Sequence, residues 1–169
     1  KIGQYQDIRH RTVDSIAQLY HIDMAHAAKV RDTAMALFEQ VADEWQLRPH
    51  ARLLAYSATL HEIGLHINSK SLHKHGGYII SNSDLPGFSE ALQLDLARLI
   101  TNHRKKPNEL MLAELDPNHK LTLNRLLSLL RLAVLLNLGR IAKTLTLDHI
   151  KVIPDGLMLV LPSHKRKIS

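Results

Sequence analysis

Cysteine is absent from the chain, and aromatic residues, glycine and proline are scarce among its 169 residues. Without cysteine the chain has neither a disulfide framework nor a thiolate zinc site, which is typical of a cytoplasmic protein. One Trp, four Tyr and two Phe are all the aromatic residues, so the core is expected to consist mainly of Leu, Ile, Ala and Val. Seven Gly and six Pro leave room for long uninterrupted helices, and the frequent Leu favours them.

Long apolar segments are also missing. No apolar run reaches the roughly 18 residues that a transmembrane helix needs, so no membrane partner is expected. The first residues, Lys1–Asp7, lack the apolar segment of a signal peptide and an initiator Met. We therefore interpret the chain as part of a longer polypeptide. The sequence contains no Gly-rich phosphate loop and no Gly-x-Ser-x-Gly motif of serine hydrolases.

The charge that is present is mostly positive. The formal net charge is +6, and twelve His can add to it below about pH 6.5. A basic domain of this kind suggests an anionic partner, such as polyphosphate, a nucleotide, nucleic acid or an acidic protein surface. Nucleic acid is the weakest of these alternatives, because aromatic residues are not interleaved with the basic ones. The charge could also serve solubility alone.

Apolar periodicity predicts a mainly α protein of six or seven helices. The expected helices cover residues 8–20, 23–45, 49–62, 72–82, 89–106 and 121–138, with a single turn of helix inside the polar connection 107–119. Asp23 and Ser89 are suitable N-caps, and Pro49 suits a first helical turn. We expect the last helix, the most apolar, to be central and buried on most sides.

After Thr144 the pattern changes to two short alternating segments around Pro154–Gly156, which predicts a small C-terminal β hairpin. An isolated hairpin is marginally stable, so it should pack on the helices or extend another sheet. We therefore divide the chain into a helical domain at residues 1–144 and a short β-containing segment at residues 145–169.

A first candidate site combines His26, the adjacent pair His61 and Glu62 at the end of an apolar helix, and Asn137. Imidazoles bind divalent transition metals, and a neighbouring carboxylate adds charge. The layout resembles the metal site of HD-type phosphohydrolases, which implies an HD-domain-like helical bundle. Two positions depart from the HD pattern: Glu62 is one methylene longer than Asp, and Asn137 stands where the last carboxylate would be.

With one carboxylate left, the site has lost the charge that a metal centre uses to activate water. We interpret it as a vestigial metal site held by hydrogen bonds. A functional hydrolytic centre and non-catalytic binding of a divalent metal or an anion are the alternatives. We also expect Arg131, alone in an apolar helix, to pair with a buried carboxylate such as Glu62.

A second candidate site is basic. Two clusters follow the His61 helix and could meet at one rim, where they would hold a polyanion by charge-assisted hydrogen bonds. They comprise His73, Lys74 and His75 in the first cluster, and His103, Arg104, Lys105 and Lys106 in the second. The alternative is that these are solvated charges, or cations that complement a helix C-terminus.

Several motifs occur together in a characteristic order. They are Asp7–Val13, Tyr20–Asp23, Leu37–Gln40, Leu60–Leu65, Asn82–Phe88, His103–Lys105 and Leu129–Ala133. In this order they resemble the C-terminal region of the exopolyphosphatase/guanosine-pentaphosphate phosphohydrolase (Ppx/GppA) family. The resemblance covers roughly residues 5 to 163.

The resemblance implies two preceding actin-like domains that carry the active site, so no catalytic residue is expected in this chain. It also implies that this C-terminal domain helps to bind polyphosphate or pppGpp-type anions and contributes to a homodimer. One alternative is an independent HD-type metal phosphohydrolase acting on nucleotides. Another is a pure dimerisation or scaffold module.

Overall fold

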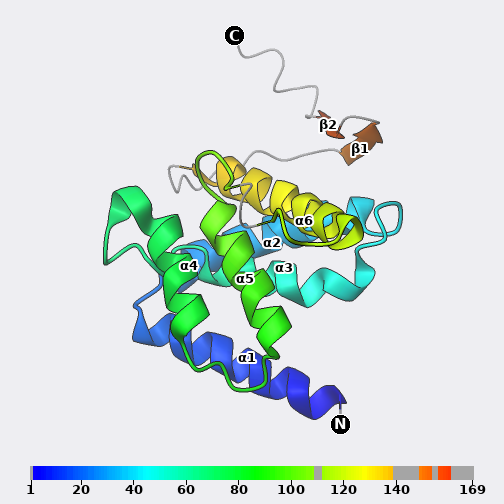
Figure 1. The fold of residues 1–169 in the computed structure, drawn as a ribbon. Helices are drawn as coiled ribbons and strands as arrows, with labels where there is room; N and C mark the ends of the chain where they lie inside the picture. Colours follow the sequence, from blue (N-terminus) through cyan, green and yellow to red (C-terminus); the bar gives the residue numbers. More distant parts are fainter. Residues whose placement is uncertain (1, 109–111, 139–148, 154–155, 161–169) are drawn as a thin grey trace.

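The computed structural model describes the backbone of residues 2–108, 112–138, 149–153 and 156–160, and the side chains of 8–108 and 112–138 (Figure 1). Within these ranges the protein is mainly helical, as predicted. The α-helices are α1 (Ile2–Leu19), α2 (Met24–Val41), α3 (Ala51–Leu60), α4 (Leu72–Asn82), α5 (Glu90–Asn102) and α6 (Pro117–Leu136). Two short 3-10 helices, η1 (Arg48–His50) and η2 (Ser69–Ser71), precede α3 and α4. None of the helices in the described ranges combines the length and hydropathy needed to cross a bilayer.

Short polar side chains start the helices where the sequence predicts them. The Asp23 carboxylate accepts a hydrogen bond from the main-chain N–H of His26, and the Ser89 hydroxyl accepts one from Leu92. The predicted start of the last helix was wrong by one turn. Asp116 caps α6 and Pro117 occupies its first turn, so this helix begins four residues before Leu121.

The turn between α4 and α5 ties α1 to the rest of the protein. Gly87 has φ +88°, a conformation that residues with a Cβ rarely adopt. The Thr12 hydroxyl donates to the carbonyl of Pro86 at 2.7 Å, and Arg9 Nε donates to the carbonyl of Gly87 at 3.0 Å. These long-range bonds fix the turn against α1.

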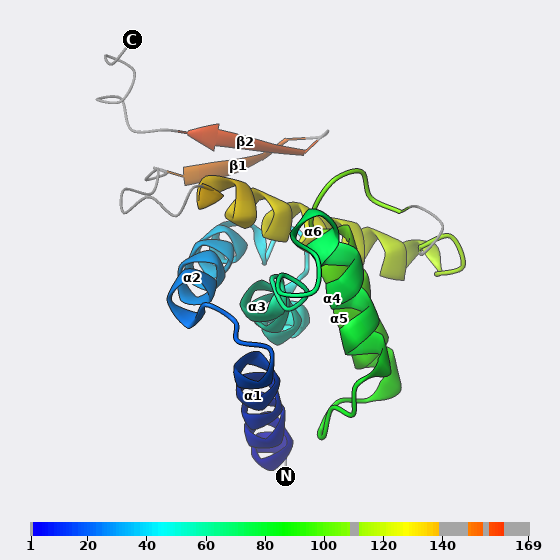
Figure 2. The same cartoon turned by 90° about the vertical axis from the view of Figure 1, so that its left-hand side faces the viewer.

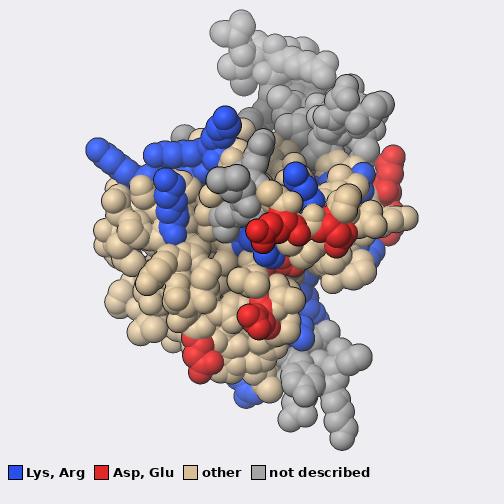
Figure 3. Space-filling model, in the orientation of Figure 1, with Lys and Arg blue, Asp and Glu red and all other residues tan. Residues whose placement is uncertain are grey.

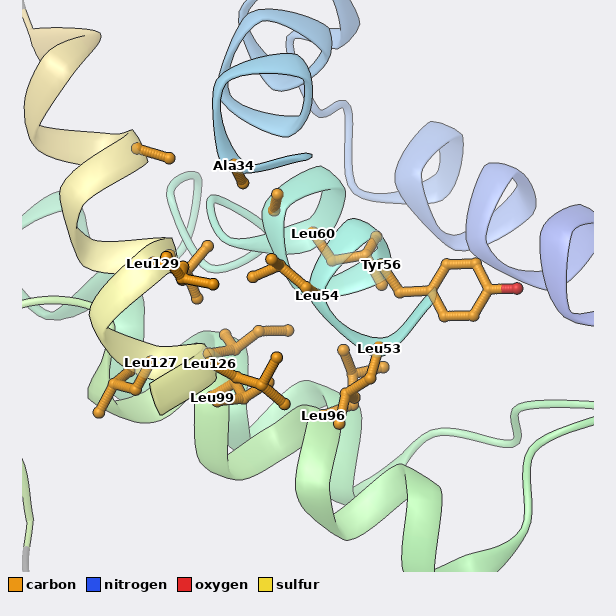
Figure 4. Close-up of a cluster of buried hydrophobic side chains, with 14 of the residues drawn as sticks. Ala34, Leu53, Leu54, Tyr56, Leu60, Leu96, Leu99, Leu126, Leu127 and Leu129 are labelled. Carbon is orange, nitrogen blue, oxygen red and sulfur yellow. The ribbon is translucent and has the colours of Figure 1, made fainter. Parts of the chain in front are cut away.

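The centre of the bundle is α3. It contacts α1, α2, α5 and α6, and in Figure 2 it lies between α2 and the α4–α5 pair. Leucines of α3 pack against leucines of α5 and α6 in the core, and Ala34 of α2 lies at the edge of this cluster (Figure 4). The expectation that the last helix is central was wrong: α6 packs by one face, while Leu121 and Leu135 are 47% and 60% exposed.

Close backbone packing joins α4 to its neighbours. A Cβ on Gly64 would meet the carbonyl oxygen of Leu72 and lie 2.7 Å from the nitrogen of Gly76. A Cβ on Gly77 would run into the Thr101 hydroxyl of α5. Glycine thus sets the spacing between α4, α5 and the loop after α3. The outer side of this helix carries a large aromatic residue, Tyr78, which is 71% exposed although it precedes the apolar pair Ile79 and Ile80.

The C-terminal segment contains β1 (His149–Ile153) and β2 (Gly156–Val160), which pair antiparallel with His149 opposite Val160. Pro154 and Asp155, the predicted turn, lie outside the described residues, and so does the predicted boundary at residue 144. The packed hairpin, the two-unit division and the HD-like description of the bundle therefore stay predictions.

Candidate functional site

The first candidate site is a cavity of about 240 Å³ where α2, α3 and α6 end or begin. His26, His61, Glu62 and Asn137 line it, although they come from three distant parts of the chain. One ligand atom each from His26, His61 and Glu62 lies within 4.8 Å of the others. His26 Nε2 is 4.0 Å from Glu62 Oε1. The structure thus brings the first four candidates together.

The end of α3 sets the orientation of His61. The side chain is 2% exposed, and Nδ1 lies 2.6 Å from the carbonyl oxygen of Ala58. An imidazole nitrogen this close to a carbonyl must carry a proton, so in the neutral ring Nε2 carries the lone pair. The His26 ring lies against that of His61, with centroids 5.8 Å apart.

Asn137 caps the C-terminus of α6 inside the cavity. Its Nδ2 donates to Thr33 Oγ1 at 3.0 Å and to the carbonyl of Ala133 at 2.8 Å. These two bonds fix which side of the amide is oxygen. Oδ1 is buried and has no hydrogen-bond partner among the described residues.

Two histidines that we assigned to a surface rim lie in the interior. His103 and His73 are each 4% exposed, and the His103 ring stands edge-on to His61 at 5.3 Å and to His73 at 6.4 Å. Burial, followed by the charge effect of His61, lowers the pKa of His103 to about 3. Burial also lowers the pKa of His73. Both rings are therefore neutral at pH 7 and supply no positive charge to a polyanion.

The exposed members of the second site do gather. We call Lys74, Arg104, Lys105 and Lys106 the basic cluster; all four are exposed. The charges of Lys105, Arg104 and Lys74 each lower the pKa of His73 further, so these three cations lie near its buried ring. In Figure 3 Lys and Arg side chains gather at the upper left, over the end of the molecule where α4 begins and α5 ends.

The loop after α5 carries most of this cluster, and Asn102 organises it. Asn102 is 2% exposed; its Oδ1 accepts from the N–H of Asn108 at 2.6 Å, and its Nδ2 donates to the carbonyl of Arg98. Lys105 has φ +61°, so the loop reverses within a few residues. Arg131 donates to the carbonyl of Asn102 at 2.7 Å, not to a carboxylate as predicted.

A second cavity of about 650 Å³ adjoins the first. The two cavities share four lining residues, His103, Arg104, Val134 and Leu138. Lys105 and Arg131 line the second cavity but not the first. Its described lining includes no carboxylate. Sequence reasoning missed Asn102 and the contribution of Arg131 to this wall. Asn at a helix C-terminus ahead of a basic run was the available signal for Asn102.

The fold and site define a helical domain with a histidine-lined pocket beside a cationic loop, an arrangement suited to anionic ligands. The family model described as Ppx/GppA phosphatase, domain III, matches residues 8–166. The chain therefore belongs to the Ppx/GppA phosphatase family, as its domain III.

Relatives agree with this assignment. The chain is 39% identical over 162 residues to a guanosine-5'-triphosphate,3'-diphosphate pyrophosphatase of Aeromonas hydrophila, covering 93% of the chain and 32% of the relative. It is 37% identical over 164 residues to the protein of the same description from Photobacterium profundum, covering 95% of the chain and 32% of that relative. The chain thus spans about a third of the length of these relatives.

Proposed function

We propose that this domain binds the phosphate chain of polyphosphate or of a pppGpp-type nucleotide for a Ppx/GppA-type phosphohydrolase. Its catalytic groups would lie in actin-like domains outside this chain. The observation that carries the proposal is the basic cluster. Lys74, Arg104 and Lys105 lie near the buried ring of His73, beside a cavity whose described lining holds Arg104, Lys105 and Arg131 and no carboxylate.

The geometry supports anion binding because no carboxylate of the described residues forms an ion pair with these cations. Among the described residues, the arginines that form ion pairs are Arg31, Arg48 and Arg98, at other places in the fold. Arg104 Nη1 donates to the carbonyl of Ser69 at 3.0 Å, which orients the guanidinium without cancelling its charge. Charge-assisted bonds from such groups to phosphate oxygens contribute about 1.5–3 kcal/mol each.

The test compares two double variants with the same change in net charge. Arg104→Ala/Lys105→Ala should weaken binding of a defined-length polyphosphate at least tenfold at low salt and reduce its salt dependence. Arg11→Ala/Lys120→Ala removes two exposed cations elsewhere and should leave the affinity within about twofold. Equal losses in both variants would show that only net charge matters, and the proposal would fail. Competition by pppGpp then separates the two ligand classes.

The Arg104→Ala/Lys105→Ala variant also distinguishes this proposal from the independent HD-type phosphohydrolase, because the active site of that alternative does not include these two cations. That alternative places the chemistry at His26, His61 and Glu62 and predicts phosphate release by this chain alone. The family match does not favour it, and the cavity offers a single carboxylate among its described lining residues.

Self-association and contact with the actin-like domains are second proposals, supported by exposed apolar side chains. Leu19 of α1 is 69% exposed and Tyr78 of α4 is 71% exposed. Side chains of this size gain about 25 cal/mol per Å² when a partner covers them. Sedimentation should detect a dimer that Leu19→Lys or Tyr78→Lys weakens. A monomer at all concentrations would contradict the homodimer.

A further inference from the structure

The pocket of His26, His61, Glu62 and Asn137 has the features of a ligand site that the basic cluster does not explain. Two imidazoles and one carboxylate place their donor atoms within 4.8 Å of each other. We infer that this pocket binds one divalent transition-metal ion of the zinc class, which anchors phosphate oxygens instead of hydrolysing them.

The donor set fits a metal of this class. Imidazole nitrogen and carboxylate oxygen bind Zn²⁺ at about 2.0–2.2 Å, and tetrahedral ligands then lie about 3.3 Å apart. His26 Nε2 and Glu62 Oε1 are 4.0 Å apart, so a small side-chain rotation brings them into range. Glu62 is partly exposed and can make this movement.

Supporting contacts around His61 are those of a metal ligand. Its Nδ1 lies 2.6 Å from the carbonyl oxygen of Ala58, a bond that fixes the ring and, in the neutral imidazole that binds metal, leaves the lone pair on Nε2. Metal-bound histidines usually donate their second N–H in this way, because the bond sets the tautomer and makes the ligating nitrogen more basic.

Asn137 gives an independent indication of a ligand. Its Oδ1 is buried in the wall of the same cavity without a hydrogen-bond partner among the described residues, although Nδ2 makes two bonds. An unsatisfied buried oxygen costs about 1–3 kcal/mol. A metal ion, or a water bound to one, would satisfy it.

The charge of the filled pocket defines its role. A divalent ion with two neutral imidazoles and one carboxylate keeps a net charge of +1. Arg104 lines the same cavity, so the ion would extend the basic cluster inward. The link to phosphate rests on the function proposed above, whereas metal binding stands without it.

The test is calorimetric titration of the untagged full chain with Zn²⁺. We expect one site of micromolar or tighter affinity, weakened at least tenfold in His61→Ala and in Glu62→Gln. His10→Ala removes an exposed histidine of α1 and should leave the affinity unchanged. Zinc binding that is absent, equal in all variants, or equally reduced in His10→Ala would overturn the metal site. If His61→Ala does not fold, Glu62→Gln decides alone.

A second titration separates the two claims. Polyphosphate should bind at least threefold more tightly to the zinc-loaded wild type than to chelator-treated protein, and zinc should not help Glu62→Gln. If polyphosphate binds equally with and without a bound zinc ion, the anchoring role fails while the metal site remains. If zinc binds but polyphosphate does not bind at all, the proposed function fails instead.

Discussion

The buried histidine His103 should make the stability of this domain unusually sensitive to mild acid. Its pKa is lowered to about 3, mainly by burial and then by His61, from an ordinary value of 6.5. Between these values the unfolded chain binds a proton that the folded chain does not, so stability falls as the pH is lowered. The loss follows a slope of about 1.4 kcal/mol per pH unit and reaches about 2 kcal/mol between pH 7 and pH 5.

The assay is urea unfolding at a series of pH values with a chelator present. His103→Gln should lower stability at pH 7, because it disturbs a packed site. Between pH 7 and pH 5, the free energy of unfolding of this variant should fall by about 2 kcal/mol less than that of the wild type. His73 and His50 also have lowered pKa values and contribute in the same direction, but they are unchanged in this comparison. His10→Gln is the control, since this side chain is exposed. Parallel pH curves for His103→Gln and wild type would refute the reasoning.

Further predictions concern packing and capping, each measured by chemical unfolding. Gly64→Ala should cost at least about 2 kcal/mol, because the added methyl meets main-chain atoms; an unchanged midpoint would contradict the close approach. Leu54→Ala should cost about 2–5 kcal/mol because the side chain is fully buried, whereas Leu94→Ala, 39% exposed, should cost under about 1; similar losses would contradict the described core. Asp116→Ala should cost about 1 kcal/mol through loss of the α6 cap, and a neutral result would place the start of α6 elsewhere. Asn102→Ala should weaken polyphosphate binding although it removes no charge, and full retention of affinity would show that the loop needs no such support.

Local signals in the sequence were sufficient for most helices. Asp23 and Ser89 start helices because their side chains satisfy N–H groups within three residues, a contact that spacing alone predicts. The start of α6 was missed because apolar periodicity was followed and the cap at Asp116 was not. The exposure of Tyr78 could not be read from spacing, since which side of α4 is covered depends on where α5 and the loop after α3 pack.

The candidate site shows the same division. The resemblance to the HD-type layout predicted that His26, His61, Glu62 and Asn137 form one site, and all four line one cavity, although their role in binding metal stays a proposal. The burial of His73 and His103 was not predictable, because their sequence neighbours are exposed cations and only tertiary packing turns the rings inward. The partner of Arg131 is a main-chain carbonyl, for which no side-chain pattern exists.

The glycine contacts between α4, α5 and the loop after α3 have a consequence for ligand capture. Lys74 lies on α4 and Arg104 follows the end of α5 by two residues, so main-chain packing fixes the distance between the attachment points of their side chains. The burial of the apolar core therefore overcomes the repulsion among these like charges when the protein folds. Under the proposed function, an incoming anion would therefore meet cations that are already assembled, and each bound phosphate would relieve repulsion between them.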